Sequence, residues 1–156
     1  MPTNVSPRLK KLYAPHPQAE ARRLSATRLA EAILAAPDVD PSHRRQFLSF
    51  CLWKHTEADG KWAVRYRSKE AVHGPVADIQ HEHVIPRNLL VEKVIANLEH
   101  VGEILASVLA CLVTKEEHRR LTAVGSFVEG WDRYTAAGVV VLDMVTGEPF
   151  TPPQVP

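Results

Sequence analysis

Cysteine, aromatic residues and long apolar runs are scarce in this sequence. Its two cysteines, Cys51 and Cys111, stand far apart, which argues against a disulfide-stapled secreted scaffold and against a structural zinc held by Cys-x-x-Cys pairs. The longest aliphatic run, Val139 to Leu142, is far too short to span a bilayer, and no apolar signal segment follows Met1. We therefore expect a cytoplasmic protein without a membrane partner, in which both cysteines act as small core residues.

The sequence also lacks an excess of charge of either sign, because 19 Lys and Arg residues stand against 18 Asp and Glu. The chain as a whole therefore offers no electrostatic argument for nucleic acid. Positive charge is nevertheless concentrated between Arg44 and Lys69, where seven Lys or Arg residues stand against two acids. Such a local basic face suits phosphate, although a solvated surface strand has the same composition.

Within this basic stretch, residues 61–68 alternate between apolar and basic side chains. The alternation predicts a half-buried strand with a basic outer face. Its apolar members are Trp62, Val64 and Tyr66. The candidate nucleic-acid contacts are Lys61, Arg65 and Arg67 on the outer face, together with Arg87.

Three stretches have the apolar spacing of amphipathic helices. Residues 19–36 end at Pro37, and residues 41–56 follow Asp40 as the N-cap. Residues 87–110 repeat apolar side chains at a 3-4 spacing, which predicts one long helix. We expect this helix to pack against the first two in the core of an enlarged domain. A homodimer seam along the same apolar stripe is the alternative.

Gly-rich phosphate loops and Gly-x-Ser-x-Gly elbows are absent from the sequence, so the candidate chemistry rests on histidine and carboxylate. The segment His81-Glu82-His83-Val84-Ile85-Pro86 is predicted to end a strand, because proline cannot continue the ladder. Residues 112–114 are predicted as a strand that runs into a helix, with Thr114 as N-cap and Glu117 as its capping-box partner. This places His118 about one turn inside the helix. Imidazole and carboxylate groups can hold a divalent ion, and a spare imidazole can act as a general base.

The two segments resemble the motif halves of the HNH, or His-Me finger, nucleases, and they are closest to the branch typified by the colicin DNases. The resemblance implies a ββα-metal core that binds one divalent ion, such as Mg²⁺, Mn²⁺, Ni²⁺ or Zn²⁺. It also implies hydrolysis of a nucleic-acid phosphodiester, with double-stranded DNA as the expected substrate. In this family pattern His83 is the general base, Glu82 and His118 are metal ligands, and His81 is a further candidate ligand.

Two arginines follow His118 directly. Arg119 or Arg120 is expected to clamp the non-bridging phosphate oxygens, because the planar guanidinium group suits phosphate. The family's middle Asn has no counterpart directly before Leu112, so Asn88 or Asn97 would have to take its place.

Other interpretations of the same residues stay open. His81 and His83 share one face of a strand, and with His118 they would make a three-histidine zinc site. A metal-binding or nucleic-acid-binding module that kept the fold and lost catalysis is a second alternative. A helical interaction protein that dimerises through residues 87–110, with incidental histidines, is a third.

The sequence therefore predicts an α+β protein, mostly helical, with two N-terminal helices and a ββα-metal core interrupted by a long inserted helix. Residues 1–18 contain four prolines and are expected to form an extended or disordered arm. Residues 19–147 are expected to form a single HNH-like domain, and residues 148–156 a Pro-rich tail.

Overall fold

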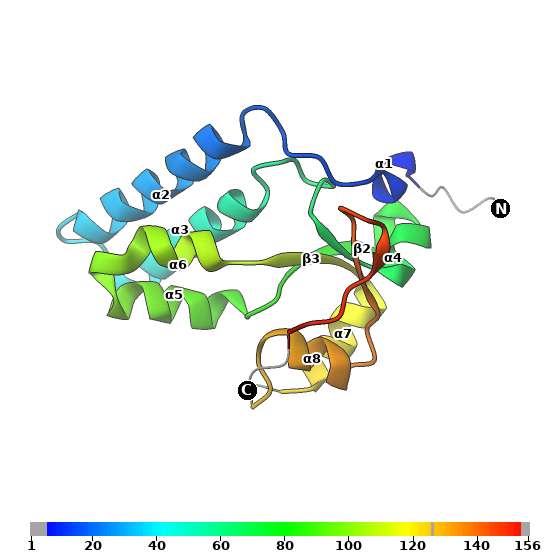
Figure 1. Cartoon of the computed structure of the whole chain (residues 1–156). Helices are drawn as coiled ribbons and strands as arrows, with labels where there is room; N and C mark the ends of the chain where they lie inside the picture. Colours follow the sequence, from blue (N-terminus) through cyan, green and yellow to red (C-terminus); the bar gives the residue numbers. More distant parts are fainter. Residues whose placement is uncertain (1–5, 126, 154–156) are drawn as a thin grey trace. The chain divides into compact units, whose positions relative to one another are not determined.

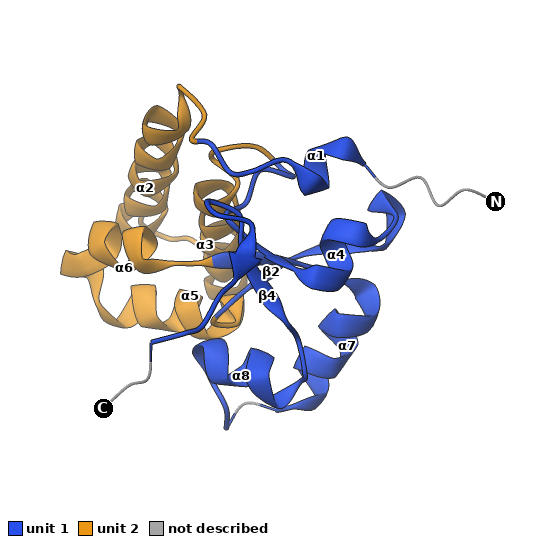
Figure 2. Cartoon of the chain, turned by 45° about the vertical axis from the view of Figure 1, so that its right-hand side comes forward, with its two compact units in different colours: residues 1–14, 61–84, 110–156 blue, residues 15–60, 85–109 orange. Residues whose placement is uncertain are grey.

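The chain forms two compact units, which Figure 2 shows in different colours. The computed structural model describes residues 6–125 and 127–153. Unit 1 combines residues 1–14, 61–84 and 110–156, and unit 2 combines residues 15–60 and 85–109. Each unit is therefore assembled from segments that lie far apart in the sequence, and the single domain predicted over residues 19–147 includes parts of both.

Unit 1 is built, within the described residues, on a five-stranded mixed sheet in the order β2-β3-β1-β4-β5. Its strands are β1 (Tyr66–Ser68), β2 (Ile79–His83), β3 (Ala110–Thr114), β4 (Val141–Asp143) and β5 (Glu148–Pro149). Strands β1 and β3 pair in parallel, whereas the other neighbouring strands are antiparallel. Helix α7 (Lys115–Ala123) follows β3 directly and packs against both β2 and β3 (Figure 1).

Apolar clusters cover the two faces of this sheet. Cys111 and Val113 of β3 belong to one cluster, with side chains of α7 and α8 (Gly130–Ala136). Ala110 and Leu112 of the same strand belong to another, with side chains of α1 (Pro7–Lys10) and α4 (Lys69–His73). Alternate side chains of a strand point to opposite faces, so the sheet has an α7 face and an α1 face.

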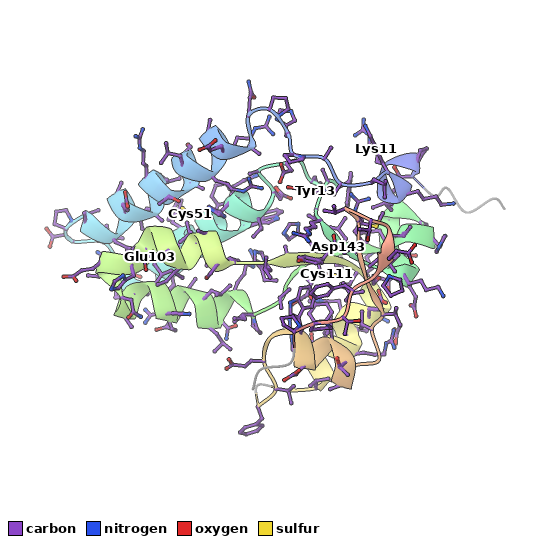
Figure 3. All side chains as sticks on the ribbon, viewed as in Figure 1. Lys11, Tyr13, Cys51, Glu103, Cys111 and Asp143 are labelled. Carbon is purple, nitrogen blue, oxygen red and sulfur yellow. The ribbon has the colours of Figure 1, made fainter. Side chains whose placement is uncertain are left out.

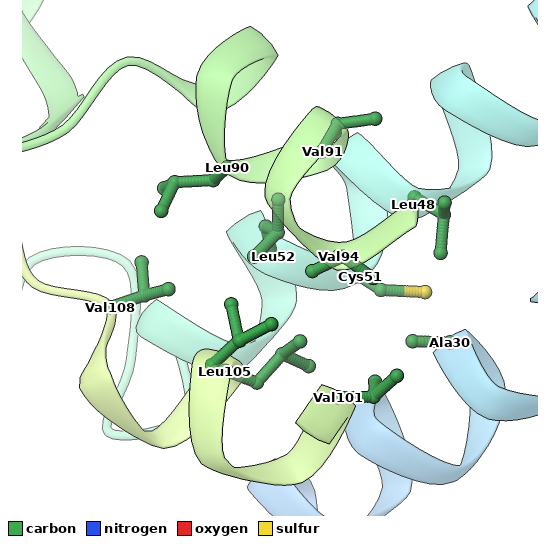
Figure 4. Close-up of a cluster of buried hydrophobic side chains, with 11 residues drawn as sticks. Ala30, Leu48, Cys51, Leu52, Leu90, Val91, Val94, Val101, Leu105 and Val108 are labelled. Atoms are coloured by element: carbon green, nitrogen blue, oxygen red, sulfur yellow. The ribbon is translucent and has the colours of Figure 1, made fainter. Parts of the chain in front are cut away.

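Unit 2 consists of helices around one apolar core, shown in Figure 4. Its helices are α2 (Ala19–Ala35), α3 (Pro41–Thr56), α5 (Arg87–Ala96), the 3-10 helix η2 (Leu98–His100) and α6 (Val101–Ser107). The Asp40 side chain caps α3 as predicted, accepting a 2.8 Å hydrogen bond from the Ser42 backbone N–H. The core includes Ala30, Leu48, Cys51, Leu52, Val94, Val101 and Leu105.

The prediction of one long helix over residues 87–110 is wrong. Helix α5 ends at Ala96, Asn97 adopts a non-helical backbone with φ −135° and ψ 61°, and the chain continues through η2 into α6. Helices α5 and α6 pack on each other and against α3 and α2, respectively (Figure 1). The 3-4 spacing therefore identifies residues that face the core but misses the break, because folding back lets both halves reach the same core.

The strand predicted over residues 61–68 is shorter in the structure, since only Tyr66–Ser68 pair with other strands. All three of these residues are buried, so β1 has no basic outer face. Residues 76–78 form the 3-10 helix η1 (Val76–Asp78) before β2 begins.

The predicted N-terminal arm and C-terminal tail are partly ordered. Within the arm, Leu9 of α1 is fully buried. Within the tail, β5 pairs with β4, and the Phe150 ring packs on the rings of Tyr66 and Trp131 with centroid distances of 4.8 and 5.0 Å. Single apolar anchors of this kind leave no periodic signal in a sequence. The rest of both predictions, residues 1–5 and 154–156, lies outside the described residues.

Helices take up more than half of the described residues, and the sheet is mixed, so the prediction of a mostly helical α+β protein is confirmed. Of the aliphatic run at residues 139–142, only Val141 and Leu142 lie in a strand, β4. None of the helices in the described ranges has the length and apolar character that crossing a bilayer requires.

Candidate functional site

The start of α7 is shaped by the capping box that the sequence predicts. The Glu117 backbone N–H donates to Thr114 Oγ1 at 3.1 Å, and the Thr114 backbone N–H donates to Glu117 Oε2 at 2.8 Å. Glu117 is almost fully buried and also accepts a hydrogen bond from the Ser68 hydroxyl. The first turn of α7 is thereby tied to β1 and β3, and His118 projects from a defined position.

Glu82 and His118 come together in this structure although they belong to different motif halves. His118 Nδ1 and Glu82 Oε2 lie 2.5 Å apart, within hydrogen-bond distance. The His118 side chain is 46% exposed, whereas that of Glu82 is 10% exposed. The pair therefore joins a buried carboxylate on β2 to an imidazole that is open to solvent on α7.

Arg133 of α8 completes this cluster, and the sequence analysis did not identify it. Its Nη2 donates to Glu82 Oε1 at 2.8 Å and to the backbone oxygen of His83 at 2.8 Å, with Val84 O at 3.4 Å. The guanidinium side chain is 6% exposed. The available signal was weak: Arg133 stands between Trp131 and Tyr134 in the sequence, and a cation beside such aromatic residues needs a buried partner if they pack inward.

His81 and His83 lie on the other face of β2 from Glu82. The register pairs Glu82 with Cys111 of the α7 face, whereas His81 and His83 pair with Leu112 and Ala110 of the α1 face. The two imidazole rings are neighbours with centroids 5.3 Å apart, as the strand period predicts. His83 is buried, at 3% exposure.

The predicted ligands are therefore only partly assembled. Glu82 and His118 meet, but His81 lies with His83 on the opposite face of the strand. In the part of the chain that the structure describes, no group of three or more His, Cys, Asp or Glu side chains is arranged to hold a metal ion. The three-histidine zinc site has no geometric support here, since alternation separates two of its members from the third.

The two arginines beside His118 direct their guanidinium groups to other partners. Arg119 is exposed and pairs with Glu116 of the same helix at 2.5 Å. Arg120 Nη1 donates to the backbone oxygen of Ala137 at 3.2 Å, and its Nη2 lies 3.5 Å from a Glu70 carboxylate oxygen. The phosphate clamp assigned to them stays a prediction, and Arg119 is the more available of the two because its pair lies at the surface.

The prediction of a solvent-facing Arg67 is wrong. Arg67 is 2% exposed, and its guanidinium group donates to the backbone oxygens of Val64, Leu9 and Lys11 at 2.9, 2.6 and 2.8 Å. Burial lowers the pKa of this guanidinium below its usual value. The group ties the N-terminal segment to β1, and its hydrogen bonds are directed to protein carbonyls instead of phosphate.

The remaining basic candidates keep accessible cations. Arg65 pairs with Asp143 through two contacts of 3.0 and 2.6 Å, and its side chain is 47% exposed. The Lys61 ammonium lies 4.8 Å from the centroid of the Trp62 ring, and Arg87 lies 5.9 Å from that of Trp53. Their role as phosphate contacts stays a prediction.

Both cysteines are buried free thiols, Cys51 on α3 and Cys111 on β3 (Figure 3). Burial raises the pKa of Cys51 to about 11. Burial, together with the nearby carboxylates of Glu117 and Glu82, raises the pKa of Cys111 well above its usual value. Both thiols are therefore protonated near neutral pH and act as core residues, as the sequence predicts.

Comparison with protein-family models, with curated proteins and with solved structures finds no match to this chain. The resemblance to the HNH nucleases therefore rests on the motif residues themselves. In this structure the antiparallel β2–β3 pair is followed directly by α7, and Glu82 of β2 contacts His118 of α7.

Proposed function

We propose that this protein is a metal-dependent endonuclease of the HNH type that hydrolyses phosphodiester bonds of double-stranded DNA in the cytoplasm. The observation that carries the proposal is the contact between Glu82 and His118. These residues lie 36 positions apart, on a strand and on the helix that follows its partner strand. Both residues are ligand positions in the motif halves that resemble the HNH nucleases.

The donor set of this pair suits a divalent ion. A carboxylate oxygen and an imidazole nitrogen are ligands that Mg²⁺, Mn²⁺, Ni²⁺ and Zn²⁺ share to different degrees. Bound beside the scissile phosphate, such an ion supplies Lewis-acid polarisation and stabilises the leaving oxygen. Glu82 supplies negative charge from a buried position, and half-exposed His118 supplies a nitrogen on the side open to substrate.

The general base is a separate assignment, and we propose His83 for it. Its main chain is held in place, because its backbone oxygen accepts a hydrogen bond from Arg133. Its ring is buried on the α1 face, so the base role requires access to the reacting water at the end of β2, where pairing with β3 stops at Ala110. A general base takes a proton only while the water attacks the phosphate, whereas a metal ligand holds the ion before the reaction begins.

This difference in timing separates the roles by experiment. His118→Ala and Glu82→Ala are expected to weaken Mn²⁺ binding measured by calorimetry, and excess metal should partly restore plasmid cleavage. His83→Ala is expected to keep the fold, the Mn²⁺ affinity and the DNA affinity while lowering the cleavage rate by roughly 10² to 10⁴. Cleavage should be assayed with Mg²⁺, Mn²⁺, Ni²⁺ and Zn²⁺.

Two outcomes contradict the proposal in different ways. If His83→Ala abolishes metal binding and Glu82→Ala has no effect, the ligands are histidines and the family's role assignment is wrong for this chain. If the wild-type protein neither binds Mn²⁺ nor cleaves DNA with any of the four ions, the chain is not a nuclease.

One observation favours a second candidate, a binding module that keeps the fold without catalysis. Both oxygens of the Glu82 carboxylate already have partners, Arg133 at Oε1 and His118 at Oε2. The cluster would then be a structural ion network, and its loss would lower stability without removing any activity. The helical dimer alternative is less favoured, because most of the apolar stripe of residues 87–110 is buried in the core of unit 2, and its member Leu98 is exposed.

A further inference from the structure

Arg133 contacts Glu82 through one nitrogen of its buried guanidinium group, Nη2. It projects from α8, is 5% exposed, and directs its Nη2 at Glu82 Oε1 and at the backbone oxygens of His83 and Val84. An Nη2 group carries two hydrogens, so the contacts at 2.8 Å to Glu82 and His83 are its main bonds. One guanidinium group therefore grips both the side chain of Glu82 and the main chain that follows it.

Arg133 at Oε1 and His118 at Oε2 together restrict rotation of the Glu82 carboxylate. Oε1 is occupied by Arg133, so Oε2 is the oxygen presented to His118. The hydrogen bond from Arg133 to His83 O also fixes the main chain at the end of β2, which carries the Glu82 side chain. A carboxylate fixed in this way has its orientation set before any ligand arrives, which lowers the entropy cost of binding.

We propose that Arg133 is a positioning residue for the Glu82–His118 pair: it orients the carboxylate for ion binding and touches neither ion nor substrate. The inference rests on the proposed metal-dependent function. It also makes a counter-intuitive claim, because a buried cation beside a metal ligand repels the incoming ion by simple electrostatics. Orientation must outweigh that repulsion for Arg133 to help.

The change in Mn²⁺ affinity on replacing Arg133 shows whether orientation of the carboxylate outweighs charge repulsion. In Arg133→Gln, loss of the guanidinium charge by itself favours cation binding, so a weaker affinity arises either from the lost orientation or from weakened folding of unit 1, which a control variant separates. We expect the Mn²⁺ affinity of the full chain, measured by calorimetry, to fall about tenfold or more, the usual effect of removing a group that orients a metal ligand. An affinity equal to or tighter than wild type overturns the inference.

Arg67→Gln is the matched control. Arg67 is also buried in unit 1 and donates to backbone oxygens, but none of its contacts involves Glu82 or His118. We expect this variant to lower the thermal unfolding midpoint while keeping the wild-type Mn²⁺ affinity. If both variants lose affinity to the same degree, the effect comes from weakened folding of unit 1, and the positioning role is wrong.

Arg133→Lys is the second variant, for use if Arg133→Gln does not fold. Lysine retains the buried charge opposite Glu82 but is one atom shorter, so it cannot grip the carboxylate and His83 O as Arg133 does. We expect Mn²⁺ binding weaker than wild type in this variant too, and wild-type affinity would overturn the inference. A wild-type protein that binds no Mn²⁺ defeats the proposed function itself, whereas normal wild-type binding with unaffected variants defeats the role of Arg133 alone.

Discussion

His55 shows how burial changes a single side chain in this protein. It lies in the last turn of α3 and is 7% exposed. Burial, together with the charge of Arg23, lowers the pKa of His55 from 6.5 to about 4. The imidazole is therefore neutral in the folded chain at pH 7 and resists protonation until the solution is strongly acidic.

Stability is expected to fall with decreasing pH because of this group. Between pH 6.5 and pH 4 the unfolded chain binds a proton at this histidine and the folded chain does not. The free energy of unfolding should therefore be highest above pH 6.5 and fall by up to about 1.4 kcal/mol per pH unit through this window. Urea unfolding of wild type and His55→Gln at pH 7, 6 and 5 measures the difference.

His43→Gln is the control for this experiment. His43 lies on the same helix but is exposed, so its replacement should leave the pH dependence of unfolding unchanged. The interpretation of His55 is wrong if the free energy of unfolding of His55→Gln falls as steeply as that of wild type between pH 7 and pH 5.

At the scale of elements, helices α6 and α8 depend on glycines in different ways. Gly102 lies in the first turn of α6, and a Cβ added to it would meet the Thr27 methyl group at 3.8 Å, an ordinary contact. Gly138 follows α8 with φ +66°, and its N–H donates to the Thr135 oxygen at 3.0 Å. The first position tolerates a side chain, whereas the second needs the left-handed conformation that ends the helix.

Opposite stability changes follow for the same substitution. Gly102→Ala should raise the free energy of unfolding by about 0.5 kcal/mol, since alanine is the better helix former. Gly138→Ala should lower it by about 1 to 2 kcal/mol, the cost of a left-handed alanine. Chemical unfolding of the two variants beside wild type tests both, and a destabilised Gly102→Ala would contradict the helical start assigned to α6.

On the scale of the whole molecule, the charge of the chain is nearly balanced, at +1. Any affinity for DNA must therefore come from local cations such as Lys61, Arg65 and Arg87 instead of a general field. Arg67 is excluded from this set by its burial. The two arginines near β1 thus have opposite roles, one at the surface and one inside.

Salt dependence of duplex binding should reflect this division. Lys61→Gln and Arg65→Gln should each reduce the slope of log affinity against log salt by about 0.9 if each contacts one phosphate. Arg67→Gln should lower stability but keep the wild-type slope. Binding isotherms at several NaCl concentrations measure the slopes. A duplex affinity that does not depend on salt would contradict phosphate binding by these surface cations.

The sequence by itself determined the features that depend on near neighbours. The capping box of Thr114 and Glu117, the cap of α3 at Asp40 and the end of β2 before Pro86 follow from contacts within a few residues. These signals placed Glu82 at the end of a strand and His118 in the first turn of a helix. Apolar spacing likewise identified the residues that form the core of unit 2.

Only the tertiary structure decided which groups meet across long distances in the chain. It pairs Glu82 with Arg133, 51 residues away, and buries Arg67 among carbonyls up to 59 residues away. It also breaks the insertion at Asn97 and places His83 on the opposite face of β2 from Glu82. The spacing of apolar residues shows which side of a helix or strand faces the core. A charged residue can be buried on that side only if it has a partner, and in this protein the partners come from distant parts of the chain.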